Sequence, residues 1–291
     1  MRLETSIQFH WSPLPDKCSR DAAQFVDLCR CAEASGFESV HVPVASDLSD
    51  ALALAIAAGV ETNHIKFRIG WNFEEVLRSL FGRKMKEAWV TLQGRLIFHM
   101  NFDSEDAARN GRLEQATEFM TNCRCLFDQL EVPEFDIEGE TAEAAFLAIK
   151  HANRLWRLAN RPDQIYADAL PVLHFGKRVG LLSSVIARET QQEALDVAAT
   201  LLPSNFVEHR EDPSSWPTPY LWRGLFSDWP GKSAAFVGSF EEVARSIHGF
   251  KKKGILQFLI REWSDKQEMF CSGARVLSLV REMEVGRVAF E

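Results

Sequence analysis

The sequence has none of the features that mark a membrane-bound or secreted protein. Among its 291 residues no apolar run approaches the length of a membrane span, and residues 1–4 do not begin a signal peptide. Acidic residues also outnumber basic ones, and the formal net charge is −8. A negative charge disfavours nucleic acid or an anionic membrane as the main partner. These absences make the cytoplasm the expected location, with no membrane and no nucleic acid among the partners.

Several catalytic motifs are missing as well. The chain contains no G-x-S-x-G, which argues against a serine hydrolase, and neither a P-loop nor a G-x-G-x-x-G dinucleotide fingerprint. Cys29 and Cys31, like Cys123 and Cys125, stand two residues apart in helical patterns. Side chains at that spacing point in different directions and suit neither a zinc site nor redox chemistry. We therefore expect the cysteines to be ordinary packed or surface thiols.

What the chain does contain is a regular alternation of strands and helices. The expected strands are residues 5–11, 38–44, 65–71, 95–101, 134–138, 153–158, 178–187 and 255–260, with helical patterns between them. Strands that alternate with helices pair in parallel through right-handed crossovers, and eight such units close a ring. The sequence predicts an α/β fold, a single (β/α)8 TIM-like barrel that forms one domain over residues 1–291.

Local signals mark the ends of several helices. Thr190 with Glu193, and Ser239 with Glu242, have the spacing of a capping box, in which each side chain satisfies a backbone N–H at the start of a helix. Thr141 is expected to open another helix. The remaining expected helices are residues 19–35, 48–61, 74–93, 104–128, 162–173 and 264–284.

Residues 203–232 interrupt the alternation. They carry five prolines and are expected to form a mostly irregular excursion. Their aromatic side chains have two interpretations that the sequence leaves open: a lid over an apolar substrate, or packing for an irregular loop and a subunit interface. The residues concerned are Trp216, Tyr220, Trp222, Phe226 and Trp229.

In barrels of this kind the chemistry lies at the carboxyl ends of the strands and on the loops that follow. The expected rim includes His10, Trp11, Asn101, Glu138, Glu140 and Leu158. His10, His41 and His99 come from three different strands and could together ligate a metal, but no carboxylate with suitable spacing supports such a site. We expect His10 or His99 to act as a general base instead, because neutral imidazole titrates near working pH.

Several stretches resemble one protein family, in the correct order along the chain. They are residues 83–95 (RKMKEAWVTLQGR), 112–119 (RLEQATEF), 180–190 (GLLSSVIARET), 236–238 (FVG) and 254–260 (GILQFLI). Together they resemble the bacterial-luciferase-like flavin monooxygenases, in particular the alkanesulfonate monooxygenase branch. The resemblance covers most of the chain and implies a luciferase-like barrel.

The resemblance also implies an activity and a set of site residues. Members of the family bind reduced FMN, which a separate flavin reductase supplies, react it with oxygen, and oxygenate a small organic substrate. The flavin phosphate is expected near the start of the helix after strand five, at Arg112, Glu140 and Thr141, because backbone N–H groups at a helix start form an anion site. His10, Trp11, Asn101 and Trp156 are expected to line the flavin and substrate space. The family also implies a homodimer, or a heterodimer with a related barrel.

The chain departs from the alkanesulfonate branch at several of its active-site positions. The branch's cysteine aligns with Leu48, its strand-seven arginine and histidine with Leu182 and Ser184, and a small or arginine position beside the flavin with Phe102. Glu140 stands at the phosphate turn, where at 4 Å and an effective dielectric constant near 20 a like charge costs about 4 kcal/mol per unit charge. Alternatively, Glu140 simply complements the dipole of the helix that follows.

These departures leave two functions open. One is an FMN-dependent luciferase-like monooxygenase that acts on a small organic molecule. The other is a flavin-free relative that serves as a non-catalytic partner subunit or a small-molecule binder, since the family includes heterodimers with one inactive barrel. Family resemblance does not by itself establish the chemistry.

Overall fold

The computed structural model of the chain describes residues 6–13, 21–42, 48–71, 81–102, 111–125, 127, 131–201, 213–223, 234–262 and 266–286. Much of the 203–232 excursion, with Phe226 and Trp229, lies outside the described residues. The described part includes most of the strands and helices that the sequence predicts.

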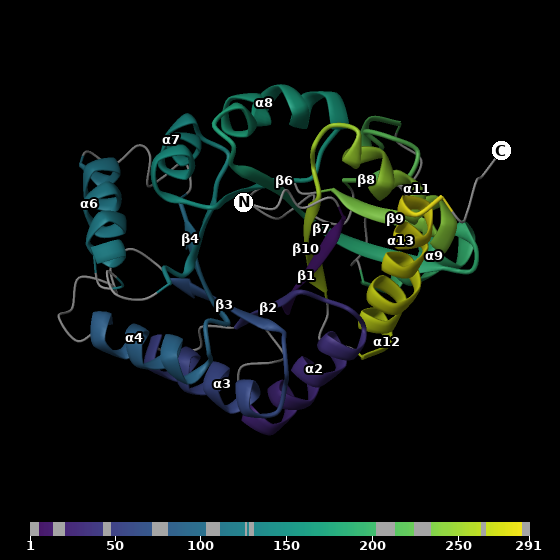
Figure 1. The fold of residues 1–291 in the computed structure, drawn as a ribbon. Coiled ribbons are helices and arrows are strands. Elements are labelled where there is room, and N and C mark those ends of the chain that lie inside the picture. Colours follow the sequence, from purple (N-terminus) through teal and green to yellow (C-terminus); the bar gives the residue numbers. More distant parts are fainter. Residues whose placement is uncertain are drawn as a thin grey trace.

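Eight parallel strands close into a ring. The hydrogen-bonded order runs from β1 to β7 without interruption, and β10 then pairs with both β7 and β1. The strands of the ring are β1 (Gln8–Pro13), β2 (Ser39–Val42), β3 (Lys66–Trp71), β4 (Leu96–Asn101), β5 (Glu134–Glu138), β6 (Arg154–Leu158), β7 (Arg178–Arg188) and β10 (Gln257–Glu262). Figure 1 shows the helices arranged around this ring. The predicted (β/α)8 barrel is confirmed.

Two strands that the sequence analysis did not predict extend the sheet beyond the ring. β9 (Ala235–Ser239) pairs in parallel with the last five residues of β7, and β8 (Leu221–Trp222) pairs antiparallel with β9. β7 can hold both neighbours because its residues 180–183 pair with β10 while its residues 184–188 pair with β9. The five-residue β9 lies between a proline-rich stretch and a helix cap, so its apolar pattern is too short to be recognised alone.

The described helices lie at the expected positions. They are α2 (Ala22–Ala34), α3 (Leu48–Val60), α4 (Phe81–Thr91), α6 (Arg112–Cys125), α7 (Ala142–His151), α8 (Pro162–His174), α9 (Gln191–Leu201), α11 (Phe240–Lys251), α12 (Lys266–Met269) and α13 (Ser278–Glu284), with a π-helical segment η3 (Phe270–Leu277) between the last two. Thr141 caps α7, and both expected capping boxes form, at Thr190 and at Ser239. None of the described helices has the length and apolar content that crossing a bilayer requires.

Two strands, β1 and β10, are shifted toward the carboxyl terminus from their expected positions. β1 begins three residues later than expected and ends at Pro13, because proline has no backbone N–H to continue the ladder. β10 runs to Glu262, beyond the end of the apolar run. It continues because Arg261 points into the barrel and pairs with Glu138 there.

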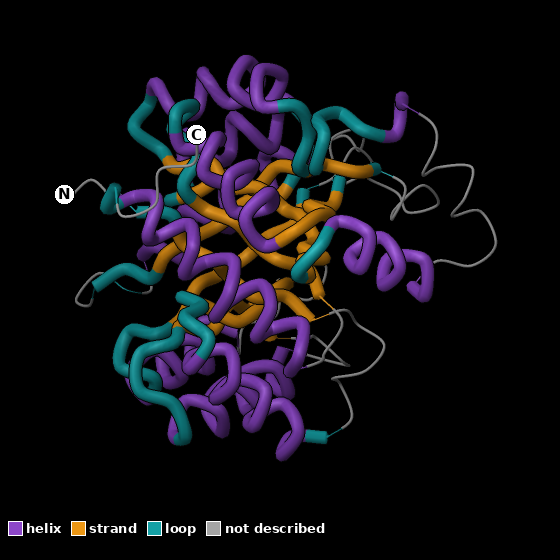
Figure 2. Tube along the Cα trace, turned by 90° about the vertical axis from the view of Figure 1, so that its right-hand side faces the viewer, coloured by secondary structure: helices purple, strands orange, loops and turns teal. Residues whose placement is uncertain are grey.

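The core has two layers of different character. Between the ring and the helices lies a large apolar core to which most elements contribute, and Figure 2 shows the strands enclosed by helices. Inside the ring, by contrast, most of the buried side chains are polar or charged, including Arg68, Asp136 and Arg154. Removing a charged side chain from water costs free energy unless an opposite charge compensates it, and these interior residues are paired with one another.

Candidate functional site

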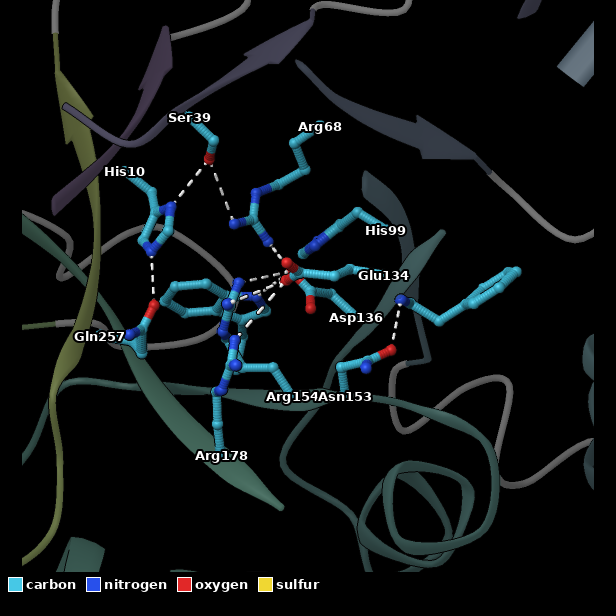
Figure 3. Close-up of polar contacts among 12 residues, drawn as sticks. His10, Ser39, Arg68, His99, Glu134, Asp136, Asn153, Arg154, Arg178 and Gln257 are labelled. Atoms are coloured by element: carbon cyan, nitrogen blue, oxygen red, sulfur yellow. Dashed lines mark hydrogen bonds and ion pairs between the residues drawn. The ribbon is translucent and has the colours of Figure 1, made fainter. Parts of the chain in front are cut away.

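The amino-terminal half of the barrel interior is filled by a network of charged side chains, which we call the amino-end network (Lys66, Arg68, Glu134, Asp136, Arg154 and Arg178). Except for Lys66, Figure 3 labels these side chains, which converge from neighbouring strands, with two arginines directed at one aspartate. Each alternates along its strand with an apolar residue that faces the helices, as the two-residue period of a strand requires.

Asp136 is the centre of this network. Its Oδ2 accepts hydrogen bonds from Arg68, from Arg154 Nη1 at 3.1 Å and from Trp156 Nε1 at 2.9 Å, and the carboxylate is fully buried. Burial alone would raise the pKa of Asp136, but the positive charges of Arg154 and Arg68 outweigh burial and lower it. Asp136 is therefore a buried carboxylate that stays ionised because two guanidinium groups hold it.

Glu134 carries the outer part of the same network. Its carboxylate lies 2.6 Å from Lys66 Nζ, 3.3 Å from Arg154 Nη2 and 3.7 Å from Arg178 Nη1. Arg154 thus bridges the two carboxylates. Every one of these groups is engaged with another, so the amino-terminal half of the interior acts as a structural plug.

His10 lies in this half of the barrel and not at the rim. Its Nε2 donates to Gln257 Oε1 at 2.6 Å, and Ser39 Oγ lies 2.8 Å from its Nδ1. Burial, followed by the charges of Arg154 and Arg68, lowers the pKa of His10 well below its ordinary value. His10 is neutral with both ring nitrogens occupied, and this position does not support the expected role as a general base.

Trp156, expected to line the flavin space, packs against the arginines of the same network. Its ring lies 4.6 Å from the guanidinium carbon of Arg68 and 5.2 Å from that of Arg154, and its N–H is donated to Asp136. Gly180 on β7 makes room for the indole, since a Cβ at that position would lie 2.3 Å from Trp156 Cζ3.

A second group of polar side chains lies toward the carboxyl ends of the strands, and we call it the mouth cluster (His41, His99, Glu138 and Arg261). Glu138 is its centre, with His99 Nε2 at 2.9 Å from one carboxylate oxygen and Arg261 Nη2 at 2.7 Å from the other. The His41 ring meets the His99 ring edge to face, with centroids 5.3 Å apart. Four residues from β2, β4, β5 and β10 thus meet at one place.

The charge on Glu138 fixes the hydrogen-bonding state of His99. Burial would raise the pKa of Glu138, but the Arg261 charge and the hydrogen bond with His99 outweigh it and hold the pKa well below its usual range. An ionised carboxylate only accepts, so the Nε2–H of His99 is the donor in this hydrogen bond. Within the described residues, the buried Nδ1 atoms of His99 and His41 have no hydrogen-bond partner.

Opposite the mouth cluster the interior is apolar. Leu158, Leu182 and Leu259 form a small cluster with Trp156 on the inner face of β6, β7 and β10, which we call the apolar wall. Of the residues expected near the flavin, Asn101 is exposed at the end of β4, opposite Glu138 in the β5 register. The interior therefore contains an apolar group of side chains beside its charged ones.

The start of α7 carries the residues expected at a phosphate site. Thr141 Oγ1 accepts from Ala144 N at 3.1 Å and is thereby used as the helix cap. Glu140 Oε1 accepts from the backbone N–H of Leu158 at 2.7 Å, and its Oε2 lies 3.6 Å from Arg157 Nη1. Glu140 is thus tied to the end of β6. Arg112 is the first residue of α6, on a different helix and partly exposed.

Two residues expected beside the flavin lie on the other side of the strands. Trp11 and Phe102 are both fully buried in the apolar core between the ring and the helices. Each follows an inward-facing residue by one position, and successive strand residues point to opposite faces. Trp11 does not line the interior, and Phe102 does not occupy the space beside a bound ring. Leu182 and Ser184, by contrast, do lie inside, where Ser184 Oγ donates to the carbonyl of Arg261 at 2.5 Å.

The aromatic residues described within the excursion pack against the outside of the barrel. Trp216 and Trp222 are stacked with centroids 5.8 Å apart, and they join a small core formed by α9, the end of β7 and β9. Tyr220 lies against Gly238 of β9. In the structure Trp216 and Trp222 therefore serve as packing for the irregular segment.

Sequence reasoning missed Arg261 and the pairing of His99 with Glu138. The signal was the alternation Glu134, Asp136, Glu138 in a single strand, which local reasoning assigns to a solvent-exposed face. In a closed ring that face points inward. In the part of the chain that the structure describes, no group of three or more His, Cys, Asp or Glu side chains is arranged to hold a metal ion.

Comparisons with known proteins identify the fold. No family model matches the sequence, and none of the curated proteins searched matches it. Solved structures do: EDTA monooxygenase from Chelativorans sp. BNC1 is similar with a TM-score of 0.73 at 12% identity, over 96% of this chain and 94% of that one. A long-chain alkane monooxygenase has a TM-score of 0.71 at 13% identity, over 99% and 94% of the two chains. A riboflavin lyase with modified FMN and its substrate riboflavin has a TM-score of 0.70 at 13% identity, over 96% and 92%. At such low identity these likenesses establish the fold alone, and the expected (β/α)8 barrel is confirmed.

Proposed function

We propose that this protein is a luciferase-like oxidoreductase, a flavin-dependent monooxygenase of a small organic molecule that binds at the carboxyl end of the barrel. One observation carries the proposal: the mouth cluster places an oriented imidazole, a carboxylate and a guanidinium at the end of the barrel where such enzymes work. The fold supports it, because its neighbours include two monooxygenases and a riboflavin lyase solved with FMN.

The types of side chain in the interior support the choice of a flavin ring as the ligand. The apolar wall offers Leu158, Leu182 and Leu259 to an aromatic ring system, and the mouth cluster faces it with groups that can hydrogen-bond the ring's polar edge. The buried Nδ1 atoms of His41 and His99, which have no partner among the residues described, are two such groups.

The phosphate end does not fit FMN equally well. At the start of α7 the Glu140 carboxylate already occupies the backbone N–H of Leu158, and the Thr141 hydroxyl is used as the helix cap. Gly139 leaves no cradle either, since a Cβ there would lie 2.3 Å from the carbonyl oxygen of Phe102. We therefore propose a flavin as the redox group and leave its phosphate without an assigned place.

The residues of the chain have separate tasks in this proposal. Glu138 holds His99 in one tautomer, so that Nδ1 is the atom that accepts a proton from a bound molecule or a water. Arg261 keeps Glu138 ionised, and its partly exposed guanidinium adds positive charge near the mouth. The proposal includes a separate flavin reductase and a dimer with a second copy or a related barrel.

A flavin-free barrel is the second candidate, and Glu140 is the observation that favours it. With a carboxylate in the place expected for a phosphate, the barrel would act as a binder of another small molecule or as a non-catalytic partner subunit.

The test is spectroscopic. We expect the purified protein, titrated with FMN, riboflavin and dithionite-reduced FMN, to perturb the absorbance between about 350 and 500 nm on binding at least one of them. Saturable binding in the micromolar range that weakens in His99→Gln and Glu138→Gln variants would support the mouth as the site. Absence of binding of all three at high micromolar concentration would leave the flavin-free candidate.

A further inference from the structure

The start of α7 has the character of an anion site that is already filled from within the chain. The two carboxylate oxygens of Glu140 are directed at a backbone N–H and a guanidinium: Oε1 lies 2.7 Å from Leu158 N, and Oε2 lies 3.6 Å from Arg157 Nη1. The N-terminus of α7 contributes the positive end of the helix dipole at the same place. Three sources of positive potential thus surround one carboxylate.

Arg157 is the independent sign that an anion belongs here. Its side chain is 7% exposed, and its Nε has no hydrogen-bond partner within the described residues. A buried guanidinium requires compensation, and among the described residues the carboxylate paired with it is the 48% exposed Glu140, at the long distance of 3.6 Å. The guanidinium is therefore only partly satisfied, as expected where a stronger anion could replace a side chain.

Leu158 connects this site to the interior of the barrel. Its side chain belongs to the apolar wall, while its backbone N–H is the donor that Glu140 occupies. A ligand that contacts the Leu158 side chain therefore lies near the backbone N–H that Glu140 occupies. The charge at that point then decides whether the ligand can carry a phosphate.

We propose that Glu140 is an internal substitute for a ligand phosphate, so that this barrel takes a flavin without a phosphate, such as riboflavin, in preference to FMN. The proposal rests on the flavin function proposed above and names the class of flavin. Burial raises the pKa of Glu140, against the Leu158 hydrogen bond and the Arg157 charge, which shows that the carboxylate is held at some cost to its ionised form.

The experiment compares the wild-type protein with Glu140→Gln and Glu143→Gln. Glutamine at position 140 keeps an acceptor for Leu158 N and removes only the charge, whereas Glu143 lies in the first turn of α7 and controls for the general charge of that helix start. Riboflavin and FMN are titrated into each protein by quenching of flavin fluorescence. Inorganic phosphate is titrated separately by calorimetry and by its effect on thermal stability.

Wild-type protein is expected to bind riboflavin more tightly than FMN, by tenfold to on the order of a thousandfold, from one like charge near a phosphate. Glu140→Gln should shift that ratio toward FMN by at least about tenfold and should be stabilised by phosphate, while Glu143→Gln keeps the wild-type ratio.

The two proposals fail in different ways. If wild-type protein binds FMN as tightly as riboflavin, or if the ratio is unchanged in Glu140→Gln, the role of Glu140 is wrong although flavin binding stands. If no variant binds either flavin, the flavin function fails, and the phosphate titration still tests the anion site. Equally weak binding of phosphate to wild-type protein and to Glu140→Gln would overturn the role of Glu140.

Discussion

Replacing Asp136 with asparagine should strongly destabilise the barrel. The asparagine side chain would keep the size of the aspartate, but Arg68 and Arg154 would lose their shared buried counter-charge. At an effective dielectric constant of 20, each ion pair near 4 Å is worth about 4 kcal/mol, and the variant loses two such pairs. It also avoids the cost of burying an ionised carboxylate, which is several kcal/mol and offsets part of that loss. The net loss should be about 3–5 kcal/mol, the range for removing one partner of a buried ion pair.

The assay is urea and thermal unfolding of wild-type and Asp136→Asn protein, followed by circular dichroism and tryptophan fluorescence. At roughly 2 °C per kcal/mol for a chain of this size, the midpoint temperature should fall by about 6–10 °C. The control is Glu87→Gln, which breaks an ion pair with Arg83 whose two side chains are 68% and 74% exposed and should cost less than about 0.5 kcal/mol. A loss under about 1 kcal/mol for Asp136→Asn would refute the account of the interior as a plug held by this carboxylate.

Three further perturbations test other parts of the structure. Glu138→Gln should lower the free energy of unfolding, measured with urea, by only about 1–2 kcal/mol, because Arg261 is 29% exposed and can regain water. A loss equal to that of Asp136→Asn would mean that the mouth cluster is needed for stability in the same way as Asp136. Gly180→Ala should lower the free energy of unfolding by about 3 kcal/mol or more, because the new methyl group clashes with Trp156. Gly249→Ala lies in α11 with open space at its Cβ and should raise it by roughly 0.5–1 kcal/mol. Equal effects of the two substitutions in thermal melts would contradict the packing around Gly180. Glu33 accepts from three consecutive backbone N–H groups, and although burial opposes it these bonds lower its pKa. Its stabilisation should therefore be complete above about pH 4.3 and vanish as the pH falls through the lowered pKa, so the difference in unfolding between Glu33→Gln and wild type should be largest at pH 7 and should close as the pH is lowered through that pKa.

The fold was predictable because its signals are local and repeated. Thr190 with Glu193, and Ser239 with Glu242, form the capping boxes that their spacing predicts, and each helix lies where its apolar period is found. A ring of eight parallel strands then follows from the order of elements alone. β9 escaped prediction because its pairing with β7 depends on the unusual length of β7, which no local pattern of five residues reveals.

The site was less predictable, because it depends on which face of each strand turns inward and on pairs far apart in the chain. Trp11 and Phe102 stand next to interior residues in the sequence, yet they face the helices, and a shift of one position reverses the direction of a side chain. The contact between Arg261 and Glu138 joins residues that are 123 positions apart. Charge alternation in β5 marks a polar face, but only closure of the ring makes that face an interior one.

The division of the interior limits where ligand preference can arise. In the amino-terminal half Asp136 is held by both Arg68 and Arg154, so a ligand would have to break these buried ion pairs in order to bind there. In the carboxyl-terminal half, Glu138 and Glu140 each hold a partner that remains partly solvated or only partly satisfied. Substitutions in the first set should change stability and leave ligand preference intact, whereas those in the second set should change preference at small cost in stability. On the proposed function, ligand preference therefore depends on two carboxylates near the mouth, whereas the stability of the fold depends on Asp136 below them.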